Sequence, residues 1–115
     1  MSTIKGIGFD LVDCDRFRAM AQKRPTLIER LFSAEEIAYA NKYSDPTVHL
    51  CACFAVKEAY LKALGTGING QVLKQIEMGH EKTGTPFVTI CGERVPALVS
   101  VSHTDKTAGA VVVLF

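Results

Sequence analysis

Phe54-Ala-Val-Lys-Glu-Ala-Tyr-Leu-Lys-Ala-Leu-Gly-Thr-Gly-Ile68 combines helix formers, an acid, a base and a glycine turn. Its alanines recur every four residues, and so do Glu58 and Lys62, so an apolar stripe and a charged pair occupy different faces of one helix. Gly65 follows the last good helix former and suits the left-handed residue that ends many helices. A turn of free N–H groups beside a lysine can hold phosphate. The stretch therefore predicts a closely packed helix followed by a possible anion-binding turn.

The start of this helix is marked further upstream. Asp45-Pro46 places a capping residue before a proline, which is favoured at the first helical position. The sequence therefore predicts a helix over residues 46–64. At about 1.5 Å per residue, its length is roughly 28 Å.

Two shorter helices are predicted before the long one. An aspartate, Asp13 or Asp15, caps the first of them, which Pro25 stops. Ser33-Ala-Glu-Glu36 is a capping-box pattern that opens the second, which is expected to run to about Tyr43.

The remaining segments alternate apolar and polar residues and predict strands. Ile4 to Val12 is expected to form the first strand, with Asp10 at its carboxyl end. The predicted later strands are about 73–79, 87–91, 98–103 and 108–115. The predicted fold class is α+β, with an N-terminal strand and helices including one long helix, followed by an antiparallel sheet. The whole chain, residues 1–115, is expected to form a single domain.

Charge, hydropathy and cysteine spacing argue against several classes of protein. With 13 Lys plus Arg against 12 Asp plus Glu, the formal charge is +1, so no global basic field indicates nucleic acid binding. No apolar run is long enough to cross a bilayer, and residues 1–6 lack the apolar core of a signal peptide, so the cytoplasm is the expected compartment. The cysteines match no zinc spacing and are interpreted as reduced core residues: Cys14, Cys51, Cys53 and Cys91.

Two acids and a lysine are the candidate catalytic residues. Asp10 and Glu58 offer the hard oxygen ligands that Mg2+ prefers, and one or two carboxylates plus substrate phosphates often hold that ion. Lys62 can reach the same side of the helix as Glu58 and neutralise a phosphate. The residues alone leave a simpler interpretation open, in which Asp10 is a turn acid and Glu58 forms an exposed ion pair with Lys62.

Three motifs, in order along the chain, resemble the signature of the 4'-phosphopantetheinyl transferases. They are Gly6-Ile-Gly-Phe-Asp10 for G-I-G-x-D, Lys57-Glu58-Ala59 for K-E-A, and Ser102-His103-Thr104 for S-H-T. The resemblance extends over about residues 4–113. It implies the fold of that family and a Mg2+ site at Asp10 and Glu58.

The resemblance also implies which residues contact coenzyme A. They are Lys62, Gly65, Thr66, Gly67, Pro86, His103 and Thr104. Lys62 is expected at the pyrophosphate, and the glycine turn after it is expected to line the nucleotide. Pro86 belongs to a turn that resembles a G-K-P turn near the adenine. His103 is assigned to the nucleotide's phosphates; without the resemblance, a histidine at this place is more often a hydrogen-bonded core residue.

Two positions depart from the family pattern. Cys53 stands where many relatives have arginine, and a cysteine cannot replace that charge. Thr85 stands where the G-K-P turn has a cation. These departures leave an alternative open, in which the chain is a non-catalytic module that binds coenzyme A or a carrier protein.

The resemblance implies a reaction in fatty acid biosynthesis. With Mg2+, 4'-phosphopantetheine moves from coenzyme A to a serine of apo-acyl carrier protein, and adenosine 3',5'-bisphosphate is released. Acyl carrier proteins are acidic, so the predicted contacts are basic residues of the first helix: Arg16, Arg18 and Lys23. Small family members are homotrimers with sites between subunits, and the same assembly is expected here. A second alternative is a structural α+β oligomer without Mg2+-dependent nucleotide binding.

Overall fold

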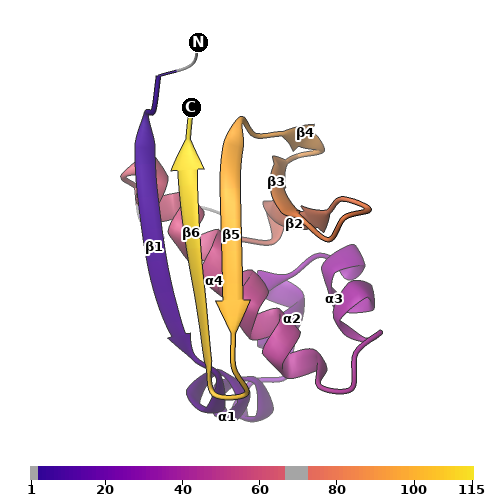
Figure 1. Cartoon of the computed structure of the whole chain (residues 1–115). Helices are drawn as coiled ribbons and strands as arrows, with labels where there is room; N and C mark the ends of the chain where they lie inside the picture. The colour runs from indigo at the N-terminus through magenta and orange to yellow at the C-terminus, as the bar shows by residue number, and fades with distance from the viewer. Residues whose placement is uncertain (1–2, 67–72) are drawn as a thin grey trace.

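The larger sheet of the protein joins the two ends of the chain. The computed structural model describes residues 3–66 and 73–115. In the larger sheet, β1 (Gly6–Asp13) and β5 (Ala97–His103) both pair with β6 (Thr107–Leu114), and both pairings are antiparallel. Figure 1 shows β6 as the central strand. The first strand therefore pairs with the last one in sequence.

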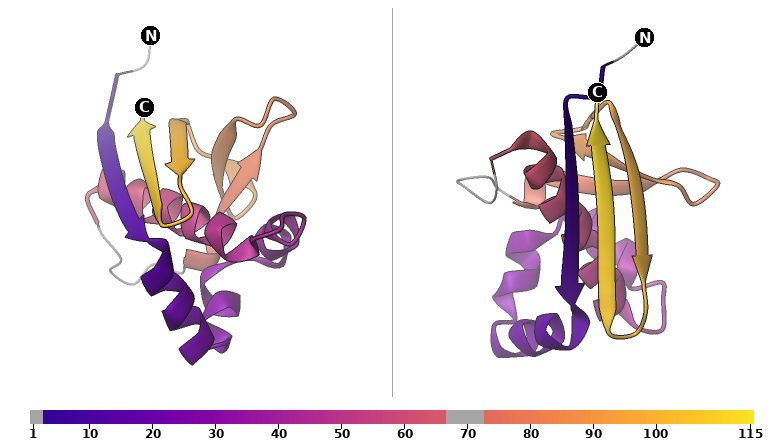
Figure 2. Two further views of the ribbon diagram at one scale, coloured as in Figure 1. Left: turned by 60° about the horizontal axis from the view of Figure 1, so that its bottom comes forward. Right: turned by 60° about the vertical axis from the view of Figure 1, so that its left-hand side comes forward.

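A smaller antiparallel sheet lies beside the β5 edge of the larger one (Figure 2). Its strands, in the order β2-β3-β4, are β2 (Ile76–His80), β3 (Pro86–Ile90) and β4 (Glu93–Arg94). The 3-10 turn η1 (Leu73–Gln75) precedes them, so the strand predicted from residue 73 begins three residues later.

Helices fill the chain between β1 and the smaller sheet. They are α1 (Cys14–Lys23), α2 (Thr26–Leu31), α3 (Ala34–Ala40) and α4 (Pro46–Leu64). Asp13 caps α1 by accepting the N–H of Arg16 at 3.0 Å, and Ser33 and Glu36 form the predicted capping box of α3. The predicted bounds of α4 are confirmed. None of the helices in the described ranges is long and apolar enough to cross a membrane.

The core lies between α4 and one face of the larger sheet, as Figures 1 and 2 show. The predicted alanine stripe of α4 is buried there, with Ala55 and Ala59 fully enclosed. The opposite face of the sheet carries exposed apolar side chains. On β1, Ile7, Phe9 and Leu11 are 67%, 54% and 63% exposed. One face of the sheet is therefore buried within the chain and the other is available to a partner.

Three details differ from the prediction. The strand β1 continues to Asp13, so Asp10 lies within the strand and not at its end. Helix α3 ends at Ala40, before the predicted end at Tyr43. Cys91 is exposed, whereas the other three cysteines are buried as predicted. Cys91 lies in the turn after β3 with a φ of 50°, and a tight turn at the surface keeps even an apolar side chain in solvent.

Candidate active site

Two glycines allow β1 to lie directly on α4. A Cβ atom added to Gly8 would be 1.8 Å from the carbonyl oxygen of Ala59, and one added to Gly6 would be 2.0 Å from that of Ala63. A side chain at either glycine would therefore push the strand away from the helix. Because side chains alternate along a strand, Gly6, Gly8 and Asp10 point to the same face. The close approach of the two backbones thus places Asp10 against α4.

Asp10 and Lys62 form an ion pair where β1 crosses α4. The Nζ atom of Lys62 is 3.0 Å from Oδ1 of Asp10, and it also donates to the carbonyl oxygen of Phe9 at 3.0 Å. The side chain of Lys62 is 52% exposed and that of Asp10 is 13% exposed. The cation therefore remains accessible while the carboxylate is held in place.

Glu58 adds a second carboxylate to this pair. It lies one turn before Lys62 on α4, and its side chain is half-buried. Burial and then the negative charge of Asp10 raise the pKa of Glu58, while the positive charge of Lys62 opposes the change. Two mutually repelling carboxylates suit a shared divalent cation. The structure brings Asp10, Glu58 and Lys62 together, and their catalytic roles stay a prediction.

The turn after α4 has the predicted left-handed glycine. Gly65 has a φ of 81°, and its N–H bonds to the carbonyl oxygen of Lys62 at 3.0 Å. The N–H of Thr66 bonds to the carbonyl oxygen of Leu61 at 3.3 Å. Both N–H groups therefore close the end of the helix instead of facing solvent as free donors. Gly67, which the sequence also assigns to the nucleotide, lies outside the described residues.

The sequence did not predict a buried ion pair between α4 and α3. The Nζ atom of Lys57 is 2.6 Å from Oε1 of Glu36, and the two side chains are 0% and 2% exposed. Lys57 also donates to the carbonyl oxygens of Leu31 at 2.7 Å and Leu73 at 2.9 Å, and Glu36 accepts the N–H of Met78 at 2.9 Å. These bonds tie α2, α3, η1 and β2 to α4. The lysine of the K-E-A motif is therefore a structural residue.

Cys53 belongs to the same buried network. Its thiol is 2.9 Å from Oε2 of Glu36 and donates to it, and the residue is only 3% exposed. Burial raises the pKa of the Cys53 thiol. The departure from arginine at this position therefore places an uncharged side chain inside the fold.

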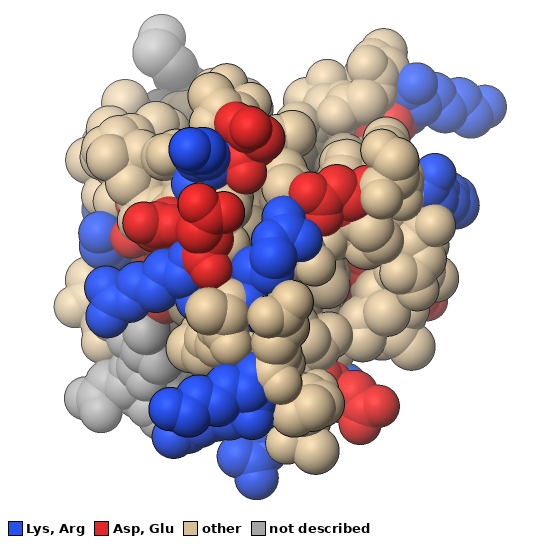
Figure 3. Space-filling model, turned by 90° about the horizontal axis from the view of Figure 1, so that it is seen from below, with Lys and Arg blue, Asp and Glu red and all other residues tan. Residues whose placement is uncertain are grey.

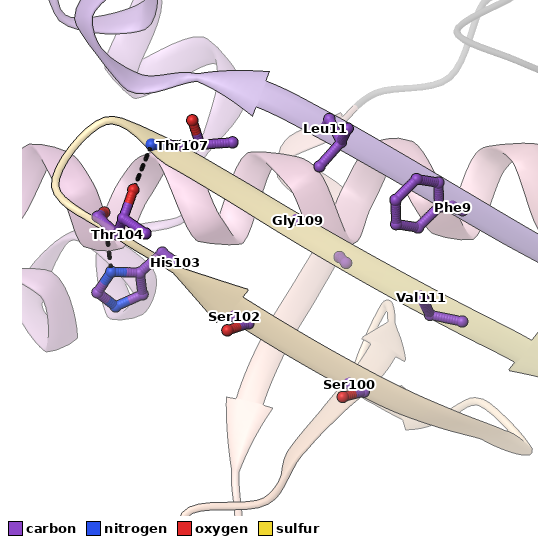
Figure 4. Close-up of a pocket in the computed structure, with 10 residues that line it drawn as sticks. Phe9, Leu11, Ser100, Ser102, His103, Thr104, Thr107, Gly109 and Val111 are labelled. Carbon is purple, nitrogen blue, oxygen red and sulfur yellow. Dashed lines mark hydrogen bonds between the residues drawn. The ribbon is translucent and has the colours of Figure 1, made fainter.

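His103 and Thr104 lie at the end of β5, where they line a surface pocket of about 360 Å³ (Figure 4). The pocket is on the sheet face opposite α4 and includes Phe9. The Oγ1 atom of Thr104 accepts the N–H groups of Lys106 at 3.2 Å and Thr107 at 3.0 Å, which fixes the turn into β6.

The assigned residues fall into two groups within the described part of the chain. The ring of His103 is 5.7 Å from that of His49, near the start of α4. His49 and Glu58 are separated by roughly 13 Å along the helix axis, at about 1.5 Å per residue. Pro86 begins β3 and pairs with His80. One chain therefore presents the acids with Lys62 and the histidine with Thr104 at separate places.

The basic residues assigned to carrier recognition lie on α1. Arg16 and Lys23 are exposed, but the two terminal guanidinium nitrogens of Arg18 donate to the carboxylate of Asp45, at 3.2 and 2.9 Å. The hydrogen bonds between them raise the pKa of Arg18 and lower the pKa of Asp45. Figure 3 shows basic and acidic side chains interspersed at this end of the molecule. Arg18 therefore forms a partly exposed ion pair within the chain.

Comparisons with known proteins identify the family of this fold. The sequence profile of the 4'-phosphopantetheinyl transferase superfamily matches residues 6–114. The chain therefore belongs to the 4'-phosphopantetheinyl transferase superfamily.

The similar curated proteins are holo-[acyl-carrier-protein] synthases. The chain is 38% identical to that of Syntrophus aciditrophicus, over 96% of this chain and 95% of the relative. It is also 38% identical to that of Enterococcus faecalis, over 96% and 97%.

Solved structures of the same kind of enzyme share the fold. The holo-[acyl-carrier-protein] synthase of Neisseria meningitidis superposes with a TM-score of 0.85 at 31% identity, covering 96% of this chain and 98% of the other. That of Bacillus anthracis, solved in complex with CoA (3',5'-ADP), gives a TM-score of 0.82 at 32% identity, covering 98% and 97%.

Proposed function

We propose that this protein is a Mg2+-dependent holo-acyl-carrier-protein synthase and that residues 1–115 form its single domain. It transfers 4'-phosphopantetheine from coenzyme A to a serine of apo-acyl carrier protein and releases adenosine 3',5'-bisphosphate. The observation that carries the proposal is the group formed by Asp10, Glu58 and Lys62, in which an exposed lysine adjoins two carboxylates.

The two carboxylates fit a Mg2+ ion that also binds substrate phosphates. The described residues contain no cluster of three or more potential metal-binding side chains, and Mg2+ usually takes only one or two carboxylates, with waters and phosphates as its other ligands. Asp10 and Glu58 would hold the ion, which would neutralise negative charge on the pyrophosphate. Burial and then the charge of Asp10 raise the pKa of Glu58, and a bound cation would relieve the repulsion between the two carboxylates.

The other residues of the site align the reactants. The serine oxygen attacks the phosphorus that carries pantetheine, and the bond from this phosphorus to the bridging oxygen breaks. Lys62 donates to the pyrophosphate and offsets the charge of the leaving group. Glu58 or a water held beside it accepts the serine proton. Gly65, Thr66 and Gly67 line the nucleotide.

A second copy of the chain is needed to complete the site. Pro86, His103 and Thr104 are assigned to the nucleotide, yet the ring of His103 lies against His49 near the start of α4, roughly 13 Å along the helix axis from Glu58. We therefore propose a homotrimer in which the His103 group of one subunit faces the Glu58 group of the next.

The uncovered face of the larger sheet supports this assembly. Ile7, Phe9 and Leu11 on β1 and Leu98 on β5 are each more than half exposed, and Figure 4 shows Phe9 and Leu11 on that face. Contiguous exposed apolar side chains on a soluble domain indicate an interface. A fully active monomer in light scattering at micromolar concentration would contradict the trimer.

The carrier protein is proposed to contact α1. Arg16, Arg18 and Lys23 present charge to an acidic partner, and Arg18 also pairs with Asp45. Arg16→Glu should weaken carrier binding in titration calorimetry and leave coenzyme A affinity nearly unchanged. An equal loss of both affinities would remove this assignment.

The mass of an apo-acyl carrier protein tests the function. After incubation with this protein, coenzyme A and Mg2+, the carrier should gain one phosphopantetheine, and Glu58→Gln should abolish the gain. Coenzyme A binding without transfer to any carrier would instead support the non-catalytic module. An absence of Mg2+-dependent coenzyme A binding would support a structural oligomer.

A further inference from the structure

All three histidines of the chain lie in one aromatic cluster with two tyrosines. His80 stacks on Tyr39 with ring centroids 4.2 Å apart, and His49 stacks on Tyr43 at 3.7 Å. The ring of His103 meets that of His49 edge to face at 5.7 Å. The cluster therefore brings side chains from α3, α4, β2 and β5 to one place, although the sequence gives no motif for it.

Two of these histidines open onto a surface pocket of about 400 Å³. His49 and His103 line it together with Thr104, so the pocket adjoins the phosphate-binding residues of the proposed function. His80 does not line this pocket; it borders a space of only about 10 Å³ on the inner side of the cluster. His80 is therefore a suitable control for His49, since each histidine stacks on a tyrosine but only His49 lines the pocket.

We propose that His49 joins His103 in binding a phosphate group of coenzyme A, and that His49 takes up a proton as the phosphate binds. This inference rests on the proposed function and adds His49 to its substrate contacts. Two N–H donors can both hydrogen-bond to one phosphate group when their nitrogens are roughly 5–7 Å apart and each nitrogen is about 2.8 Å from a phosphate oxygen. The ring centroids of His49 and His103 are 5.7 Å apart and both residues line one pocket, so a phosphate group in that pocket is within reach of both rings.

The hydrogen bonds around the pocket favour donors on its surface. The Nδ1 atom of His103 is 3.3 Å from the carbonyl oxygen of Thr104 and can donate to it, as the dashed line in Figure 4 marks. In that tautomer Nε2 accepts when the ring is neutral and donates once it is protonated. The Oγ1 atom of Thr104 already accepts two N–H bonds, which leaves its own hydrogen to donate to a ligand.

The charges around His49 explain why a phosphate should bring protons with it. The titratable groups that face it are Tyr39, Tyr43, Asp45, His80, His103 and Asp105, with Glu36 and Cys53 on the inner side. Burial lowers the pKa of His49, and charge on His103 and His80 lowers it further. Asp45 is neutralised by Arg18. The ring is therefore mostly neutral at pH 7, and a bound dianion would favour its charged form.

Titration calorimetry with coenzyme A at pH 6, 7 and 8, in two buffers of different ionisation enthalpy, measures affinity and proton uptake together. His49→Phe keeps a ring against Tyr43 but removes the proton, and His80→Phe is the matched control. We expect His49→Phe to lose about tenfold in affinity at pH 6 and to take up fewer protons. His80→Phe should match the wild type in both.

Three outcomes distinguish the inference from the function on which it rests. Unchanged proton uptake in His49→Phe, or an equal affinity loss in His80→Phe, would overturn the role of His49. Failure of the wild-type protein to modify any carrier would overturn the proposed function instead. Dephospho-coenzyme A identifies the phosphate: a variant effect that disappears with this ligand supports binding of the 3'-phosphate, and one that persists supports binding of the pyrophosphate.

Discussion

Helix α4 carries two lysines that each pair with a carboxylate from another element, and the two pairs differ in burial. Lys57 and Glu36 are 0% and 2% exposed, whereas Lys62 and Asp10 are 52% and 13% exposed. Breaking a buried pair leaves an uncompensated charge in the core, but an exposed pair adds little stability. The buried Lys57–Glu36 ion pair therefore stabilises the fold, whereas the exposed Lys62–Asp10 ion pair leaves the lysine accessible to a phosphate group.

The largest expected effect comes from replacing the two lysines in turn. Lys57→Met should lower the free energy of unfolding by about 3–5 kcal/mol, because Glu36 remains buried without its partner. Lys62→Met should lower it by less than about 1 kcal/mol, because water already solvates that lysine. Urea denaturation measures both. A greater loss in Lys62→Met than in Lys57→Met would reverse the comparison.

The packing of β1 against α4 places Asp10 beside Lys62, and a substitution in β1 can disrupt it. Gly8→Ala should cost about 1–3 kcal/mol and move Asp10 off α4, because the new methyl group meets the carbonyl oxygen of Ala59. Gly109→Ala is the matched control, since its methyl would press on the movable side chain of Leu11, at 3.1 Å, and make an ordinary contact with the carbonyl oxygen of Asp10, at 3.7 Å. Thermal unfolding and the transfer assay should separate the two variants. Equal losses of stability and transfer rate in the two variants would show that neither depends on the close approach of β1 to α4.

The smallest effect on stability concerns Glu58 and depends on pH. Its folded pKa is raised, so ionising it opposes folding, and this penalty develops as pH rises from the ordinary glutamate range through the raised pKa. Glu58→Gln avoids the penalty and should be as stable as the wild type at pH 7 or slightly more so. The difference should vanish at low pH, where Glu58 is protonated. Unfolding curves at pH 4 and 7 check this, and a less stable variant at pH 7 would contradict it.

Ligand binding provides a second comparison between Glu58→Gln and the wild type. Coenzyme A with Mg2+ should raise the melting temperature of the wild type, because a ligand that binds only the folded state stabilises it. Glu58→Gln should lose most of that increase. An equal increase in both proteins would exclude Glu58 from the metal site.

The parts of the structure that depend on local signals could be predicted from the sequence. Helix α4 has its predicted bounds because proline and glycine mark its two ends, and the caps at Asp13 and Ser33 act within a few residues. The grouping of Asp10 with α4 came from the motifs and not from periodicity. Its physical cause, two glycines against helix carbonyls, becomes visible only in three dimensions.

Two of the features that the sequence did not predict depend on contacts between distant segments, and a third depends on a turn. Lys57 looks like a surface residue of an amphipathic helix until Glu36 is seen beside it, 21 positions earlier in the chain. Arg18 and Asp45 are 27 positions apart. Cys91 was wrongly expected in the core because its apolar character was weighed without the turn that exposes it. Tertiary pairing, which no local pattern encodes, decides the first two cases, and the turn after β3 decides the third.

The Lys57–Glu36 pair is assigned a structural role and the Lys62–Asp10 pair a catalytic role. The most direct test measures the rate of phosphopantetheine transfer per folded molecule for Asp10→Asn and Glu36→Gln. Each variant removes the acid of one ion pair by the same chemical change. Asp10→Asn should lose about 100-fold or more while staying folded, because it acts on charge at the reacting phosphates. Glu36→Gln should be destabilised but keep most of its rate per folded molecule. A fast Asp10→Asn enzyme beside a folded but inactive Glu36→Gln enzyme would contradict the account.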